Sequence, residues 1–117
     1  GRPGVAADVV GATVDRIREH DAGPLQAFLG PAVCGRCYEV PADMRAEVSA
    51  LEPAAHSATW TGTPALDLPA AVRAQLQRRD ITIVGPDAPC TFEDERFFSH
   101  RREGLTGRFA AVAMLVE

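Results

Sequence analysis

The segment from Arg96 to Arg108 contains the residue types best suited to binding an anion. It carries four arginines and one glutamate, although the formal net charge of the whole chain is −4. Guanidinium groups bind phosphate or carboxylate through paired donors, and Ser99 with the amides of nearby glycines could complete an anion-binding loop. The alternative is a solvated surface on which Arg101 and Arg102 pair with the acidic run at 93–95.

Three cysteines offer a second kind of chemistry. Cys34 and Cys37 form a C-x-x-C motif, and Cys90 and His100 could supply two further ligands to a tetrahedral zinc ion. Zinc knuckles usually carry their ligands in two close pairs, whereas nine residues separate Cys90 from His100. The sequence therefore favours buried, unreactive thiols over a zinc site.

The remaining isolated polar and aromatic residues are interpreted as structural. His20 and His56 stand alone and are expected on the surface. Trp60, the single tryptophan, is expected to pack its loop onto the body of the protein, with base stacking as the alternative.

Helices that alternate with strands must position these residues. Apolar residues recur every three or four positions in three segments, which predicts amphipathic helices at 5–18, 41–51 and 67–79. Pro41 is expected as the first residue of the second helix and Asp67 as the N-terminal cap of the third. The stripes through Val9, Val48 and Leu76 are expected in the core.

Strands are predicted where short apolar runs end in glycine, proline or polar residues, at 25–29, 81–84 and 108–116. The stretch at 52–65 lacks periodicity and is predicted to be irregular, and 90–107 is expected to be loop-like, with a short helix near 93–97. This order of elements indicates an α/β layered domain.

Length and composition exclude several classes of protein. A chain of 117 residues forms at most one domain, and 46% hydrophobic residues argue against disorder. A pI near 5.3 argues against a general nucleic-acid binder. The longest apolar run, 109–116, is too short to span a membrane, since a spanning helix needs about 20 residues. An odd number of cysteines and no signal peptide predict a cytoplasmic protein.

Four separated motifs resemble one known family. They are LGPAVCGRCYEV at 29–40, LDL at 66–68, CT at 90–91 and FFSHRREGLTGRFAAVAML at 97–115. In this order they are similar to motifs of the YfiH-like family, the multicopper polyphenol oxidase or laccase-domain proteins, also described as purine nucleoside phosphorylases. The resemblance spans nearly all of the chain.

The resemblance implies a fold and a metal. The fold would be α/β, a two-sheet α/β/β/α sandwich, with residues 1–117 as the C-terminal part of a single domain whose N-terminal part is absent. The family binds one Zn or Cu ion through two histidines and one cysteine, and the corresponding motifs would lie upstream of Gly1. We therefore expect no metal ligand in this chain, and a fragment that alone is inactive and holds no metal.

The resemblance also implies an activity and a site. Family members are credited with phosphorolysis of purine nucleosides, deamination of adenosine and oxidation of phenols, so the partners would be a purine nucleoside and phosphate, without nucleic acid or membrane. The candidate substrate- and phosphate-binding residues are Ser99, Arg101, Arg102, Arg108, Cys37 and Tyr38.

Two further expectations concern what the chain associates with and what else it could be. It is expected to associate with itself or with the missing N-terminal half. The competing hypothesis is a non-enzymatic module, either stabilised by zinc or binding an acidic partner through its arginines.

Overall fold

The computed structural model describes residues 1–21, 23–114 and 116. Its helices are α1 (Arg2–Ala6), α2 (Val9–His20), α3 (Ala42–Leu51), α4 (Leu68–Gln77) and α5 (His100–Glu103), with a 3₁₀ helix η1 (Pro53–Ala55). Its strands are β1 (Gln26–Phe28), β2 (His56–Ala58), β3 (Pro64–Leu66) and β4 (Thr82–Val84).

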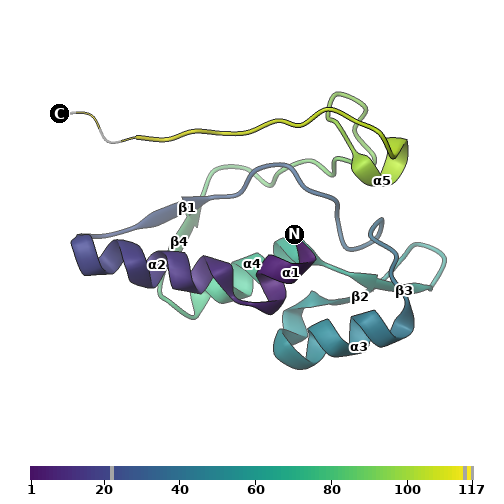
Figure 1. Ribbon diagram of the computed structural model, residues 1–117, viewed down its shortest axis with the longest axis horizontal. Coiled ribbons are helices and arrows are strands. Elements are labelled where there is room, and N and C mark those ends of the chain that lie inside the picture. The colour runs from purple at the N-terminus through teal and green to yellow at the C-terminus, as the bar shows by residue number, and fades with distance from the viewer. Residues whose placement is uncertain (22, 115, 117) are drawn as a thin grey trace.

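The strands form two small sheets. β1 pairs with β4 in parallel, with Ala27 opposite Ile83. β2 pairs with β3 in antiparallel, with Ser57 opposite Ala65. In Figure 1 the β1–β4 pair lies near α2 and α4, and the β2–β3 pair lies near α3. The chain is therefore a mixed α/β protein with two two-stranded sheets among its described residues.

Two buried clusters hold these elements together. The first joins α1, α3, β3 and α4 through Val5, Val48, Leu66 and Ala71. The second joins α2, α4 and the residue just before β4 through Val14, Leu76 and Ile81. The expected burial of Val48 and Leu76 is confirmed, but that of Val9 is wrong, because Val9 is 53% exposed.

The exposure of Val9 has a local cause. The single helix expected at 5–18 is broken at Asp8, whose φ of 49° lies in the left-handed region. The Asp8 carboxylate then caps α2 by accepting from the N–H of Gly11 at 3.2 Å. The break reorients α2 so that Val10 and Val14, rather than Val9, contact the second cluster.

The segment at 52–65, expected to be irregular, contains η1 and the β2–β3 hairpin. The hairpin closes when the N–H of Thr59 donates to the carbonyl of Thr63 at 2.9 Å. Gly62 in this turn has a φ of +86°, which glycine adopts without strain. Strands of three residues are too short to show a clear alternation in sequence, which explains why the hairpin was not predicted.

The strand expected at 108–116 is the largest error in the expected fold. Residues 108–114 and 116 form no strand, and residue 115 lies outside the described part. Val112 and Met114 are 93% and 81% exposed, and the segment runs past the body of the protein in Figure 1. A strand needs a neighbour for its backbone N–H and C=O groups, and nothing among the described residues pairs with this one.

Two expected helix features can be compared directly with the structure. Pro41 is the cap of α3 rather than its first residue. The short helix expected near 93–97 is wrong, because those residues form turns, and the short helix of this region, α5, begins at His100. No helix in the described part of the chain is long and apolar enough to cross a membrane.

The cap of α4 leads to a testable prediction. Asp67 accepts from the N–H of Ala70 at 2.9 Å, as the sequence predicts. We expect Asp67→Ala to lower the free energy of unfolding by about 1 kcal/mol, the usual cost of losing such a cap. Urea denaturation followed by circular dichroism measures this, and Glu47→Ala on the exposed side of α3 is the control. Equal midpoints for the two variants would contradict the prediction.

Candidate functional site

Two tight turns bring the three cysteines together. In the first turn the backbone N–H groups of Cys37 and Tyr38 both donate to the carbonyl of Cys34, at 3.1 Å. In the second the N–H of Asp94 donates to the carbonyl of Cys90 at 2.9 Å. Each turn therefore presents side chains three residues apart on one side.

The two turns are held against each other and against α4. Ala32 and Cys90 form a parallel bridge, in which the N–H of Thr91 donates to the carbonyl of Ala32 at 3.1 Å. A Cβ added to Gly35 would lie 2.6 Å from the Cβ of Asp67. Only glycine therefore allows the first turn to pack this closely against the start of α4.

Four potential ligand atoms converge between the turns. The sulfurs of Cys34, Cys37 and Cys90 and a carboxylate oxygen of Glu93 all lie within 4.8 Å of one another. The thiol of Cys37 donates to Oε1 of Glu93 at 3.2 Å, and the N–H of Cys34 donates to the sulfur of Cys90 at 3.3 Å. We call these four residues the thiol cluster.

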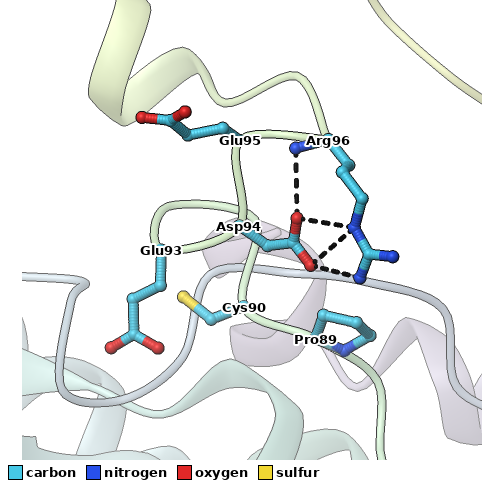
Figure 2. A pocket seen from close by; sticks show the side chains of 6 residues that line it. All are labelled: Pro89, Cys90, Glu93, Asp94, Glu95 and Arg96. Atoms are coloured by element: carbon cyan, nitrogen blue, oxygen red, sulfur yellow. Dashed lines mark hydrogen bonds and ion pairs between the residues drawn. The ribbon is translucent and has the colours of Figure 1, made fainter.

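The acidic residues around Cys90 point in different directions (Figure 2). Asp94 points toward Arg96, whose Nη2 lies 2.7 Å from its Oδ2, and this contact lowers the pKa of Asp94 to about 2. Glu93 points to the side on which the Cys90 sulfur lies, whereas Glu95 points away. Glu93 is therefore the carboxylate that this loop gives to the thiol cluster.

The three thiols differ in acidity. Burial raises the pKa of the Cys34 thiol. Burial also raises the pKa of Cys37, and the hydrogen bond to the Glu93 carboxylate raises it further. Burial acts in the same direction on Cys90, but backbone N–H groups, including that of Cys34, stabilise its thiolate and lower its pKa overall. Cys90 is thus the thiol that ionises first.

The fourth member of the cluster differs from the expected one. His100, considered from sequence as a ligand together with Cys90, is exposed at the start of α5 and is not in the group. The spacing C-x-x-E from Cys90 to Glu93 equals the C-x-x-C spacing from Cys34 to Cys37. This equal spacing is the signal in the sequence that could have indicated Glu93 as the fourth ligand. With Glu93 in place of His100, the four ligands form two close pairs, as they do in zinc knuckles.

Arg101 and Tyr38, both candidate residues, lie in contact. The guanidinium carbon of Arg101 is 4.6 Å from the centroid of the Tyr38 ring, a cation–π distance. One Nη1–H of Arg101 donates to the carbonyl of Glu39 at 2.7 Å. The structure therefore joins the C-terminal arginine segment to the residue that follows Cys37.

Arg102 is placed very differently from Arg101. Its Nη1 donates to the carbonyls of Thr91 and Phe92 at 2.7 and 3.0 Å. Its Nη2 donates to the carbonyl of Phe97 at 2.7 Å and to the Glu103 carboxylate at 2.9 Å. Most of its donors therefore stabilise the loop from which it extends.

Ser99 and Arg108 complete the predicted set. Ser99 is 4% exposed, and its hydroxyl caps α5 by accepting from the N–H of Arg102 at 3.3 Å. Arg108 is exposed, and its Nη1 donates to the carbonyls of Thr106 and Gly107. Within the described residues, neither Arg101 nor Arg102 forms an ion pair with the acidic run at 93–95, so the surface pairing considered from sequence is absent.

Trp60 borders the thiol cluster. Its Nε1–H donates to Oε1 of Glu93 at 3.4 Å, and the guanidinium carbon of Arg36 lies 4.4 Å from its ring centroid. Trp60 nevertheless remains 68% exposed. Its contacts link the hairpin turn to both tight turns, which agrees with the packing role expected from sequence.

Comparison with known proteins identifies the family. Residues 1–116 match the model of the family described as multi-copper polyphenol oxidoreductase laccase. The chain belongs to this family. The resemblance seen in the four sequence motifs is thereby confirmed, and we call the family the laccase-domain family.

Laccase-domain relatives carry a different functional name. The chain is 51% identical over 117 residues to a purine nucleoside phosphorylase of Streptomyces coelicolor, covering 98% of this chain and 48% of the relative. It is 46% identical to a purine nucleoside phosphorylase of Streptomyces griseus, with the same coverage of both chains. The chain thus spans about half the length of the relatives it matches.

The thiol cluster does not fit the metal site that the laccase-domain resemblance implies. That site uses two histidines and one cysteine and leaves a coordination position open, whereas the cluster offers three thiols and one carboxylate. The donor set of the cluster therefore differs from the one that the resemblance implies. The expectation that this chain holds no metal stays a prediction. The thiol cluster argues against it, because its four residues could bind a metal ion.

Proposed function

We propose that this chain is the C-terminal part of a purine nucleoside phosphorylase. The observation that carries the proposal is the 51% identity, over 98% of this chain, to the Streptomyces coelicolor relative of that name. In the reaction a phosphate oxygen bonds to C1′ of the ribose while the bond from C1′ to the purine nitrogen breaks. The purine takes the bonding electrons and a proton, and the products are the free base and ribose 1-phosphate.

Arg101 is the residue of this chain that we assign to phosphate. Its side chain is exposed, and its one hydrogen bond among the described residues, to the Glu39 carbonyl, leaves further N–H donors available. Contact with the Tyr38 ring restricts the guanidinium to one face of that ring, which lowers the entropy lost when an anion binds. Charge-assisted bonds from a guanidinium suit the oxygens of phosphate.

The other predicted residues would support Arg101. Arg102 and Ser99 are positioning residues in this proposal, because their hydrogen bonds shape the loop and α5, on which Arg101 lies. Arg108, exposed and in the same segment, is proposed as a second contact to the anion. Cys37 lies next to Tyr38 but belongs to the thiol cluster, so we assign it no contact with substrate.

For the intact protein we propose the two-sheet α/β/β/α sandwich, with residues 1–117 as the C-terminal part of one domain. The relatives are about twice as long as this chain. Large apolar side chains that are mostly exposed, including Phe28, Val112 and Met114, would be covered by the additional layer. This covering would also provide the segment at 108–116 with a strand partner.

The test is phosphorolysis by the full-length protein that contains this chain. We expect adenosine or inosine with phosphate to yield free base and ribose 1-phosphate. Arg101→Ala should raise the KM for phosphate roughly 10- to 100-fold, because a hydrogen bond to a charged group contributes about 1.5–3 kcal/mol. Arg96→Ala is the matched control, since Arg96 lies in the same segment but pairs with Asp94.

Two outcomes would contradict the proposed activity, and a third would contradict the role of Arg101. The first is the absence of ribose 1-phosphate with either nucleoside. The second is release of ammonia from adenosine without any need for phosphate, which indicates deamination. The third, an unchanged KM for phosphate in Arg101→Ala while phosphorolysis proceeds, would remove the role of Arg101 alone.

A further inference from the structure

We propose that Cys34, Cys37, Cys90 and Glu93 bind one Zn²⁺ ion in a closed, structural site that joins the two tight turns. The turns are 56 residues apart in sequence and meet side by side in the structure. This inference goes beyond the proposed phosphorylase activity and does not depend on it. It also reverses the expectation from sequence that the chain supplies no metal ligand.

The donor set selects zinc. Zinc is bound in proteins by thiolate, imidazole and carboxylate, and structural sites use four such ligands in a tetrahedron. Three sulfurs and one oxygen fill that tetrahedron and leave no position for water or substrate. The hard cations Mg²⁺ and Ca²⁺ prefer oxygen ligands alone, so a set rich in sulfur disfavours them.

The geometry requires little movement to accept the ion. With a Zn–S bond of about 2.3 Å, two sulfurs of a tetrahedron lie about 3.8 Å apart. The four ligand atoms already lie within 4.8 Å of one another. The sulfur–sulfur pairs therefore need to approach by about 1 Å or less, a change that side-chain rotations can supply.

Groups around the cluster would support a bound ion. The N–H of Cys34 donates to the sulfur of Cys90 at 3.3 Å, and such a bond stabilises a thiolate ligand. Trp60 donates to Oε1 of Glu93 and so orients the carboxylate. Arg36, which stacks on Trp60, adds a positive charge next to Cys37 in the first turn. Three thiolates and a carboxylate retain a net charge of −2 after Zn²⁺ binds, so a nearby cation is favourable.

An ion could reach the cluster from solvent. Cys90 and Glu93 line an open pocket of about 630 Å³, shown in Figure 2. Cys34 and Cys90 also line a second pocket, of about 380 Å³. All three cysteines are partly buried rather than sealed in the core.

The ion would stabilise a part of the chain that has little regular structure. The loop from Gly85 to Ser99 contains no helix or strand, and it leads directly into α5. In the described part of the chain, its backbone pairs with the segment just before the first turn through the bridge between Ala32 and Cys90. A metal bound across the turns would hold this loop, and with it Arg101, in place.

The test is metal binding by the reduced, metal-free chain. We expect it to bind one Zn²⁺ per chain in competition with a chromophoric chelator, and one Co²⁺ with a thiolate-to-cobalt charge-transfer band. Cys37→Ser and Cys90→Ser should each lose about a third of that band, since three thiolates contribute to it. The melting temperature should rise when Zn²⁺ is added and not when Mg²⁺ is added.

Glu93→Gln is a more specific test than the cysteine variants, because it removes the charge of the proposed oxygen ligand and leaves all three thiols in place. It should weaken Zn²⁺ binding at least about tenfold, since even outer-shell changes cost 10- to 100-fold. Glu95→Gln, in the same loop but pointing away from Cys90, is the matched control and should bind as the parent does.

The proposal is overturned if the reduced chain binds no zinc against the chelator. Full binding by the Cys37→Ser, Cys90→Ser double variant would also overturn it, as would a cobalt complex without a charge-transfer band. Equal affinities of the Glu93→Gln and Glu95→Gln variants would remove Glu93 from the site. The cobalt band reports ligation directly, so a variant of lower stability still gives a result.

Discussion

Arg102→Ala is expected to lower the free energy of unfolding by about 3 kcal/mol, although Arg102 lies on a loop. Its guanidinium donates to the carbonyls of Thr91, Phe92 and Phe97. Hydrogen bonds that involve a charged group contribute about 1.5–3 kcal/mol each, and their loss is not additive. Removing the side chain leaves several carbonyls without their donor, among them that of Thr91, a residue that is 7% exposed.

Chemical denaturation of the parent and the variant measures this loss. Arg101→Ala is the matched control, because it removes the adjacent guanidinium, which makes one hydrogen bond to a carbonyl. We expect Arg101→Ala to change stability by less than about 1 kcal/mol, because its hydrogen bond is exposed and water can replace the lost donor. A loss in Arg102→Ala no larger than in Arg101→Ala would show that the loop does not depend on Arg102.

Arg102→Lys, compared with Arg101→Ala, separates the structural and anion-binding interpretations of the arginine segment. If Arg102 only supports the loop, Arg102→Lys should be more stable than Arg102→Ala, because the ammonium still donates to some of the carbonyls. It should be less stable than the parent, because an ammonium reaches fewer of the carbonyls than a guanidinium does. In the full-length protein, Arg101→Ala should raise the KM for phosphate more than Arg102→Lys does. The reverse order would assign the phosphate to Arg102.

Leu66→Ala is expected to destabilise the chain by about 3 kcal/mol, within the range of 2–5 kcal/mol typical of leucine truncation in a core. Leu66 has no exposed surface and contacts the cluster that joins α1, α3, β3 and α4. Its N–H also pairs with the carbonyl of Tyr38 at 3.1 Å, so β3 lies directly beside the turn that carries Cys37. A cavity at Leu66 would therefore weaken the support of the thiol cluster.

Leu51→Ala provides the matched control for Leu66→Ala. The chemical change is the same, but Leu51 is 66% exposed at the end of α3. Exposed substitutions of this kind usually change stability by less than about 0.5 kcal/mol. Thermal denaturation of the two variants should give a clearly lower midpoint for Leu66→Ala, and similar midpoints would contradict the burial of Leu66.

Local signals in the sequence predicted most elements well. Asp67 caps α4 as expected, because an aspartate just before a helix accepts from a free N–H of the first turn, here that of Ala70. The strand regions at 25–29 and 81–84 contain β1 and β4. Such features depend on neighbours in sequence, and for that reason they can be predicted without the fold.

Features that depend on distant residues were predicted less well. The apolar run at 108–116 was expected to be a strand, but a strand exists only when another strand pairs with it. The exposure of Val9 likewise depends on the break at Asp8 and on which face of α2 contacts α4. Apolar periodicity alone shows neither the break nor the contact.

The sequence by itself determined the family, through four ordered motifs, and indicated the arginine segment at 96–108 as a candidate anion-binding site, whereas it favoured unreactive thiols. Only the tertiary structure decided which of these residues meet. It replaced His100 with Glu93 beside the cysteines, and it distinguished Arg101, which is exposed on Tyr38, from Arg102, which holds its own loop. The physical reason is that both choices depend on contacts between segments more than 50 residues apart, including those of Cys37 with Glu93 and Arg101 with Glu39. The spacing of residues within one segment can suggest a pair of ligands, as in Cys34 and Cys37, but it does not show which distant segment lies beside that pair.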